Sequence, residues 1–245
     1  TDDIIPAQQI FNLDSVLYYK EYDPDEEMDG TLVLDMGDST LQIPVEIRTR
    51  GVTRKKMCSF PPLRVQLEKK AVRKYGWADF RNHKLVTHCS DTLRENELLF
   101  REYLVYQMYE KLTRLSLRAQ LLDMQYILPD DTLRRYAVLL ETEEEMCRRL
   151  GLKELDIDKT KLTSIHFEHY KRFALFQYMV GNTDWNLGTG HNTKYVVEQG
   201  SSTPIVIPYD FDYSGLVNAP YAIPYETLPI SDVRERYFMY RGDKN

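Results

Sequence analysis

Apolar and polar residues alternate along several short segments in the first 140 residues. In residues 63–67, for example, leucine and valine take every second position, so Arg64 and Gln66 share the opposite face. A period of two is typical of β-strands with one buried face. The same reasoning predicts strands at residues 31–35, 41–48, 63–67, 83–88, 120–128 and 134–140. Residues 1–30 lack this pattern and are predicted to be irregular.

Helices are predicted where good helix formers follow a capping residue. Residues 92–112 follow Ser90 and Asp91, either of which can cap a helix. Apolar residues surround nearly all of this helix, which predicts that it is buried, and its acids Glu97 and Glu102 then need partners there. A short helix ending at residue 150 and a longer one at about residues 158–180 are also predicted.

This order of elements predicts an α+β protein with two lobes. Residues 1–140 would form a lobe with an antiparallel sheet and one long helix. Residues 144–245 would form a mainly helical lobe that carries a hairpin, with a hinge near residues 141–143. A cleft between two such lobes is a common place for a nucleotide.

Charge is distributed unevenly along the chain. The net charge is −6, but residues 46–84 hold 12 lysines and arginines against three acidic residues. A solvated basic face explains this excess, and so does a lobe that receives phosphates opposite an acidic lobe that holds metal. Nucleic acid is not expected as a partner, because the whole chain is acidic and has no recognition motif. No apolar run approaches the 18 residues of a membrane helix, so no membrane span is expected.

Two acidic loops flank a predicted hairpin near the C-terminal end, at residues 181–192 and 208–212. In kinases, one such loop carries a base and a metal-holding asparagine, and a later aspartate holds Mg²⁺ on the nucleotide phosphates. That order makes Asp184 the candidate base, with ATP and Mg²⁺ or Mn²⁺ as cofactors. The candidate metal ligands are Asp210, Asn192, Asn186 and Asp212.

Phosphoryl transfer also needs a cation on the phosphates, usually paired with a helix acid. The chain has neither a VAIK motif nor a Gly-rich G-x-G-x-x-G loop. Arg64 is the first candidate for the cation and Lys84 the second. Glu102 is the preferred acid, followed by Glu97. Ordinary ion pairs explain each of these residues as well.

Other functions fit the acidic loops less completely. A calcium loop is suggested by the alternating oxygen side chains of residues 182–186, but Leu187 replaces its glycine and Thr193 its glutamate. Asp210 and Asp212 match the Asp-x-Asp pair of metal-dependent glycosyltransferases, which leaves the first loop unexplained. Asparagine and aspartate also form ordinary turns and caps, and this remains an alternative for each residue alone.

Several sequence blocks between residues 48 and 214 resemble the spore-coat CotH kinase family and its uncharacterised bacterial relatives. They are Arg50-Gly-x-x-Arg, Lys84-Leu-Val, Asp91-Thr-Leu-Arg-Glu-Asn, Tyr136-Ala-Val-Leu-Leu-Glu, Gly181-Asn-Thr-Asp-Trp and Pro208-Tyr-Asp-Phe-Asp. The resemblance implies an atypical protein-kinase-like fold, ATP with a divalent metal, Asp184 as the catalytic residue and Asp210 as the metal ligand. Arg50 and Glu141, from the earlier blocks, join the expected nucleotide contacts.

One departure from the family pattern concerns the second metal ligand. The family usually places an asparagine soon after the catalytic aspartate, whereas residues 187–190 here separate Asp184 from Asn192, so Asn186 is an alternative. The prediction is thus an atypical kinase that acts on an unknown acceptor, such as a protein. The alternative is an inactive, pseudokinase-like module that binds a nucleotide or a partner.

The cysteines bear on the compartment in which the protein works. Three cysteines and no C-x-x-C pair exclude a disulfide framework or a cysteine metal motif. The chain lacks an initiator methionine and a leader, which suggests a processed product, and the resemblance implies a secreted bacterial protein. An extracytoplasmic location, whether periplasmic, lipid-anchored or secreted, is therefore expected. There Cys58 and Cys89 can pair, and buried free thiols are the alternative.

Overall fold

The computed structural model describes residues 4–10, 15, 26–51, 53–80, 82–90, 92–127, 132–156 and 164–240. Two compact units make up the chain: Thr1–Leu99 with Ala119–Thr142, and Phe100–Arg118 with Glu143–Asn245. Helix α4 (Leu93–Leu112) begins in the first unit and continues into the second. The expected lobes, residues 1–140 and 144–245, differ from these units in where they place residues 100–118.

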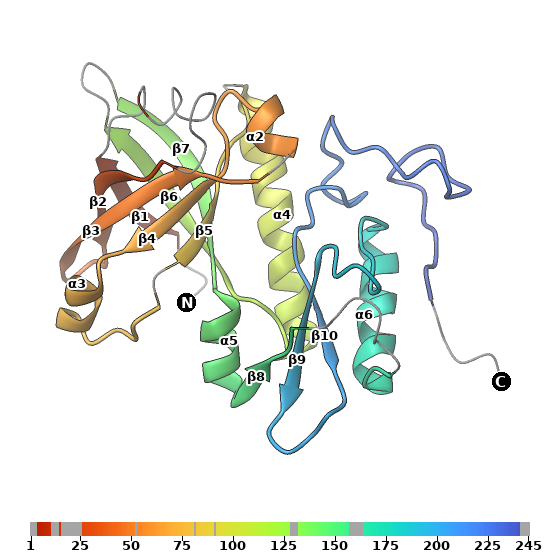
Figure 1. Cartoon of the computed structure of the whole chain (residues 1–245). Coiled ribbons are helices and arrows are strands. Elements are labelled where there is room, and N and C mark those ends of the chain that lie inside the picture. Colours follow the sequence, from red (N-terminus) through yellow and green to blue (C-terminus); the bar gives the residue numbers. More distant parts are fainter. Residues whose placement is uncertain are drawn as a thin grey trace. The chain divides into compact units, whose positions relative to one another are not determined.

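The first unit is built on a closed barrel (Figure 1). Its strands are β1 (Ile5–Ile10), β2 (Met28–Asp35), β3 (Thr40–Thr49), β4 (Leu63–Leu67), β5 (Asn82–Val86), β6 (Ala119–Ile127) and β7 (Thr132–Leu140). Around the barrel the order is β1-β2-β3-β4-β5-β7-β6, with antiparallel neighbours throughout except at the closure. There β1 pairs with β6 in parallel, from Ile5 opposite Leu122 to Ile10 opposite Ile127.

Alternation along the strands fills the barrel with apolar side chains. In β4, Leu63, Val65 and Leu67 are buried, while Arg64 and Gln66 are partly exposed. This is the outcome that the period of two predicts. The largest fully buried side chains of the barrel are Ile43, Ile47, Leu63, Leu85, Leu122, Met124 and Tyr126.

The closed barrel shows that the predicted two-lobed, protein-kinase-like fold with a helical C-terminal lobe is wrong. Residues 1–30 were expected to be irregular, yet Ile5–Ile10 forms the strand that joins β2 to β6. Without β1 the other strands would form an open sheet, which is what the sequence pattern predicted. The missing strand is therefore the physical reason for the error in this unit.

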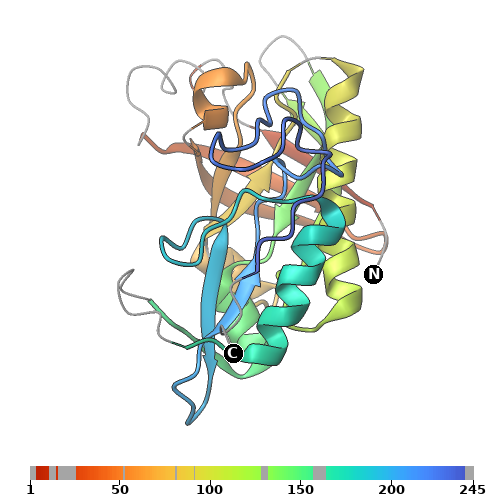
Figure 2. The ribbon, with the colours of Figure 1, turned by 90° about the vertical axis from the view of Figure 1, so that its right-hand side faces the viewer.

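The second unit contains fewer helical residues than a helical lobe requires. Its helices are the part of α4 from Phe100 to Leu112, α5 (Glu143–Leu150) with 8 residues and α6 (Phe167–Val180) with 14. Strands β8 (Leu152–Glu154), β9 (Thr193–Glu198) and β10 (Ile205–Pro208) form an antiparallel sheet in the order β10-β9-β8. Figure 2 shows α6 beside the β9–β10 hairpin. Residues 209–240 follow without a helix or strand.

Most predicted elements occur close to their expected positions, but some boundaries differ. The last helix begins at Phe167 instead of residue 158, although residues 157–163 lie outside the described part of the chain, as does the proposed cap Asp91. Within the described ranges, no helix has both the length and the apolar character needed to cross a membrane.

Two short helices and a disulfide complete the first unit. Helix α2 (Thr53–Met57) carries three basic residues, and Cys58 just after it is bonded to Cys89. Cys147 is a buried free thiol. Helix α3 (Lys69–Lys74) is capped by the Glu68 side chain, which accepts a hydrogen bond from the Ala71 N–H.

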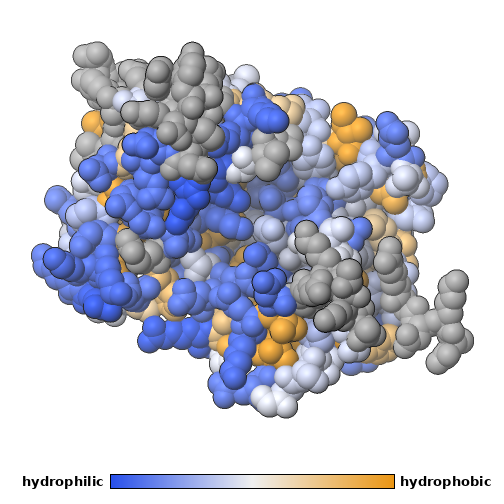
Figure 3. All heavy atoms as spheres, in the orientation of Figure 1, coloured by the Kyte–Doolittle hydropathy of each residue, from blue (hydrophilic) through white to orange (hydrophobic). Residues whose placement is uncertain are grey.

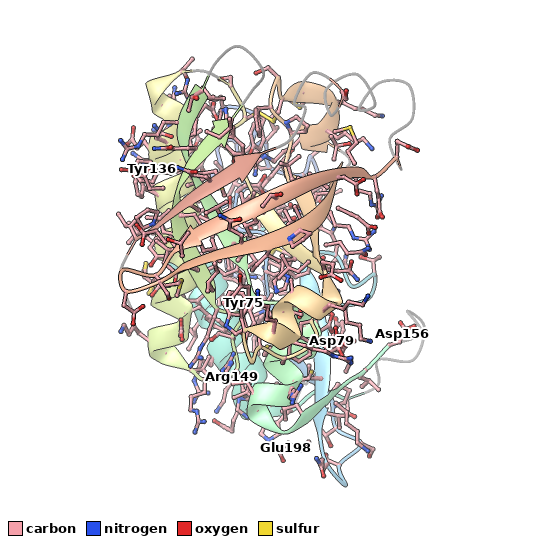
Figure 4. The ribbon with its side chains drawn as sticks, turned by 90° about the vertical axis from the view of Figure 1, so that its left-hand side faces the viewer. Tyr75, Asp79, Tyr136, Arg149, Asp156 and Glu198 are labelled. Carbon is pink, nitrogen blue, oxygen red and sulfur yellow. A yellow bond between two sulfur atoms is a disulfide. The ribbon has the colours of Figure 1, made fainter. Side chains whose placement is uncertain are left out.

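The basic excess of the sequence is partly neutralised at α3. Asp79 forms ion pairs with Lys69 and Arg73 at 2.8 and 3.0 Å, and these contacts lower its pKa, led by the hydrogen bond from Lys69. Figure 4 shows Asp79 and the C-cap Tyr75 beside this helix. The surface over α3 is strongly hydrophilic (Figure 3), so a solvated basic face accounts for this part of the charge.

Candidate functional site

The end of helix α6 sets the course of the first acidic loop. Gly181 takes the left-handed conformation (φ 68°) that ends many helices, and the Asn182 N–H donates to the Gln177 carbonyl at 2.8 Å. The Asn182 side chain then donates to Gln177 Oε1 at 3.1 Å and accepts the Asp184 N–H at 3.0 Å. Asn182 is buried, so these contacts fix the backbone from which the Asp184 side chain extends.

A tight turn brings the far side of the same loop back to Asp184. Asn186 and His191 exchange two backbone hydrogen bonds of 3.0 and 3.1 Å, which close the loop over residues 187–190. Gly190 (φ 68°) and Asn192 (φ 50°) both adopt left-handed conformations. Asparagine tolerates this region better than most residues. As a result, His191 and Asn192 both face Asp184.

Three side chains donate hydrogen bonds to the Asp184 carboxylate. His191 Nε2 lies 2.9 Å from Oδ1, and the Tyr225 hydroxyl donates to the same oxygen at 2.7 Å. Asn192 Nδ2 donates to Oδ2 at 2.8 Å and to the backbone carbonyl of Asp184 at the same distance. Hydrogen bonds to a charged acceptor are roughly twice as strong as neutral ones, so this carboxylate is held firmly in one orientation.

Asp210 begins the second acidic loop and also has a left-handed backbone (φ 63°). The hydroxyl of Tyr106, on α4, accepts the Asp210 N–H at 2.9 Å, and the Tyr106 ring packs edge-on against the buried Phe211. Over the described ranges of the chain, the Asp210 carboxylate receives no hydrogen bond and forms no ion pair. This partly exposed carboxylate is therefore oriented through its backbone and remains available to a ligand.

The two acidic loops meet around Tyr213. Burial raises the pKa of the Tyr213 phenol, and the negative charges of Asp212, Asp184 and Asp210 raise it further. All three carboxylates therefore lie within electrostatic reach of one phenol. Asp212 is the most buried of them and accepts a hydrogen bond from the Tyr221 hydroxyl at 2.9 Å.

The donor set of these loops suits a hard cation. Magnesium prefers oxygen ligands, keeps several waters and commonly takes only one or two carboxylates together with substrate phosphates. Across the described residues, no three His, Cys, Asp or Glu side chains are grouped closely enough to hold a metal by themselves. Asp210 and an asparagine oxygen could therefore bind magnesium together with water and substrate phosphates. They could not enclose the ion with protein ligands alone.

An adjacent cavity is unsuited to phosphate. It has a volume of about 500 Å³ and lies between the 187–190 turn and the acids Glu143 and Glu154. Lys194 also lines it but pairs with Glu143 at 2.9 Å. Burial and then the charges of Glu143 and Glu144 raise the pKa of Glu154. An excess of acids around a single neutralised lysine would repel a nucleotide.

The other predicted nucleotide contacts belong mostly to the first unit. Arg64 donates to Asn82 Oδ1 and forms a 3.3 Å ion pair with Glu27, and Lys84 is its cross-strand neighbour on β5. The remaining members of the first unit are Arg50, Glu97 and Glu141. Glu102 belongs to the second unit and is only 4% exposed. The roles of these residues at the phosphates remain predictions.

Sequence reasoning identified the two loops but missed most of their aromatic partners. His191 belongs to the first loop and helps to order it through its contact with Asp184. Tyr106, Tyr213, Tyr221 and Tyr225 were not predicted. The available signal was general: the chain has 18 tyrosines, and two of these four lie in the proline-rich segment after the second loop.

A comparison of the chain with protein-family models found no match, and a comparison with curated proteins found none either.

Proposed function

We propose that this protein is a phosphotransferase that uses ATP with Mg²⁺ or Mn²⁺ and transfers a phosphoryl group to an acceptor hydroxyl. The observation that carries the proposal is Asp210, a partly exposed carboxylate with a fixed left-handed backbone and no side-chain donor in the described structure. Strained aspartates of this kind are concentrated at functional sites. The fold gives no support to this proposal, since the predicted kinase-like fold is wrong.

Asp210 and Asn192 are the proposed metal ligands. Asn186 is less suitable, because its Oδ1 already accepts the Thr189 N–H at 3.1 Å. Asp212 is largely buried against Tyr221 and serves better to orient the loop. A divalent metal, when bound, neutralises charge on the nucleotide phosphates.

Asp184 is the proposed base. The loops of Asp184 and Asp210 are joined by a hydrogen bond from the Tyr209 N–H to the Asn192 carbonyl at 3.3 Å, so a group bound at Asp210 would be close to Asp184. The base of a phosphotransferase orients the acceptor hydroxyl and takes its proton. The resemblance of residues 181–185 and 208–212 to CotH kinases supports the same assignment, and the Cys58–Cys89 bond supports an extracytoplasmic location.

A second candidate function is a catalytically inactive module that binds a nucleotide or a partner. The observation in its favour is the crowding of Asp184, whose two oxygens already accept three side-chain donors. An external acceptor hydroxyl must then share Oδ2 with Asn192 or replace one of these donors. Both functions allow the protein to bind a nucleotide, so a binding measurement does not distinguish them. Only the phosphotransferase would transfer phosphate to an acceptor.

Calorimetry with ATP tests the proposed metal site. Binding should require Mg²⁺ or Mn²⁺ and should weaken about tenfold or more in Asp210→Ala, because a contact to a charged group is worth about 1.5–3 kcal/mol. Asp29→Ala is the matched control, since Asp29 is an exposed aspartate on β2. Equal affinity with and without metal, or equal losses in the two variants, would contradict the role of Asp210.

A further inference from the structure

Tyr225 is a donor to Asp184 that comes from outside the acidic loops. It follows Asp184 by 41 positions, in the irregular segment after β10, and its hydroxyl lies 2.7 Å from Asp184 Oδ1. The side chain is 51% exposed, so the ring is open to solvent while its hydroxyl reaches the carboxylate. The other two donors, His191 and Asn192, belong to the loop itself and serve to hold Asp184.

The contact has the geometry of a base and its substrate. A general base must lie about 2.6–3.2 Å from the oxygen whose proton it removes, and Tyr225 meets this condition. Desolvation of the hydroxyl, where it contacts the protein, raises the pKa of Tyr225 to about 12, and the hydrogen bond and charge of Asp184 contribute to this shift. The phenol is therefore protonated at neutral pH, and it needs a base before it can act as a nucleophile.

We propose that Tyr225 is a phosphoacceptor of this protein, modified by the Asp184 site of the same chain, an inference that rests on the proposed phosphotransferase function. In this step the Tyr225 oxygen forms a bond to the γ-phosphorus of ATP, and the bond from that phosphorus to the β,γ-bridging oxygen breaks. Asp184 Oδ1 takes the phenolic proton, and the products are phosphotyrosine and ADP. The acceptor class of the site is accordingly a phenolic hydroxyl.

Neighbouring tyrosines are placed less well for this reaction. Tyr221 donates to Asp212, which is only 7% exposed and is the carboxylate least accessible to a nucleotide. Among the described residues, no hydrogen bond joins the Tyr213 hydroxyl to a carboxylate oxygen, although the three carboxylates all act on its pKa. Tyr225 combines direct contact to the proposed base with exposure to solvent.

Modification of Tyr225 would also open the site. A phosphotyrosine carries a charge of about −1.5 to −2 at neutral pH and is repelled by nearby carboxylates. Asp184 is a direct neighbour of Tyr225, so the modified side chain would leave Oδ1. That oxygen would then be accessible to an external phenolic acceptor. In this proposal the site has two states. Unmodified Tyr225 occupies Asp184 and the site is crowded, whereas phosphorylated Tyr225 leaves Asp184 open to an external acceptor.

The test is peptide mapping by mass spectrometry after the phosphatase-treated full chain is incubated with ATP and Mg²⁺ or Mn²⁺. We expect phosphate on Tyr225, a loss of about 10²–10⁴ in its rate of formation in Asp184→Asn, and no phosphate at this position in Tyr225→Phe. Tyr237→Phe is the matched control, because Tyr237 is an exposed tyrosine in the same segment, and it should behave as the wild type. Circular dichroism of each variant checks that it is folded.

Each other outcome has a definite meaning. Phosphate confined to other residues, or Mg-ATP binding without phosphate on Tyr225, would overturn the acceptor assignment and leave the metal–nucleotide site standing. A rate constant that rises in proportion to protein concentration would overturn transfer within one chain. Absence of Mg-ATP binding in calorimetry would remove the proposed function and this inference together.

Discussion

The Asn192 side-chain amide donates two hydrogen bonds of 2.8 Å to Asp184, one to the carboxylate oxygen Oδ2 and one to the backbone carbonyl. Both hydrogens of Nδ2 are used in this way. The amide oxygen of Asn192 takes no part in these bonds and is the atom through which this residue would bind the proposed metal. A single asparagine thus links the proposed base to the proposed metal site.

Substitution of Asn192 separates its backbone role from its side-chain role. Asn192→Gly removes both hydrogen bonds but tolerates a φ of 50°. Asn192→Ala removes the same bonds and adds left-handed strain of about 1–2 kcal/mol. We expect the free energy of unfolding, measured by urea denaturation, to fall further in the alanine variant by about that amount. Equal losses would show that the left-handed backbone contributes no strain.

Asp184→Asn should preserve the fold and most of the Mg-ATP affinity. The asparagine keeps an oxygen for Tyr225 but is a far weaker base, so transfer of labelled γ-phosphate should fall by about 10²–10⁴. Calorimetry on the same preparations reports the affinity. If the variant transfers phosphate at the wild-type rate, Asp184 is not the base.

Reduction of the Cys58–Cys89 bond should destabilise the first unit. The bond closes a loop with a sequence separation of 31, and loops of this length contribute about 2–4 kcal/mol by restricting the unfolded chain. Guanidinium unfolding with and without dithiothreitol measures the difference. The Cys58→Ser/Cys89→Ser variant is the control, since its stability should not respond to the reductant. Alkylation of the oxidised, unfolded chain should label Cys147 alone; three labelled thiols would contradict the bond.

Gly215→Ala should loosen the segment near Val233. A Cβ at residue 215 would lie 2.3 Å from the Val233 carbonyl oxygen and 2.9 Å from Arg234 Cα, so this segment would have to move. We expect a loss of about 1–3 kcal/mol, as for other overpacked sites, with faster amide hydrogen exchange near residue 233.

Gly188→Ala provides the comparison for this effect. A Cβ at residue 188 would meet Asn186 Oδ1 at 3.4 Å, which is an ordinary contact, and the backbone does not have a positive φ. The free energy of unfolding of the Gly188→Ala variant should differ from that of the wild type by less than about 0.5 kcal/mol. Similar losses in the two variants would show that the close approach at residue 215 has no special cost.

Local patterns in the sequence were sufficient to predict most elements. Strands β3 and β4 alternate clearly, and the predicted residues 63–67 coincide with β4. Strand β1 was missed because its six residues, Ile-Pro-Ala-Gln-Gln-Ile, contain a proline and adjacent glutamines. Its pairing with β6 is a contact between distant parts of the chain, which local periodicity does not encode.

The candidate site shows the same division between local and distant information. Asp184 and Asn192 belong to one loop, and their proximity follows from a turn that the sequence contains. The contacts Tyr106–Asp210 and Tyr225–Asp184 span 104 and 41 positions. No local sequence pattern marks either tyrosine. Each makes a single hydrogen bond with its hydroxyl, and only the fold brings that hydroxyl to its partner.

Closure of the barrel by β1 and β6 has a consequence for synthesis of the chain. Ile5 pairs with Leu122, and a ribosome that adds about 5–20 residues per second produces β6 on the order of ten seconds after β1. During translation, β1 therefore waits without one of its two partners. An unpaired strand is a template for association with other nascent chains. Pro6 removes one backbone donor from the waiting edge, which makes the nascent strand a poorer template until β6 emerges.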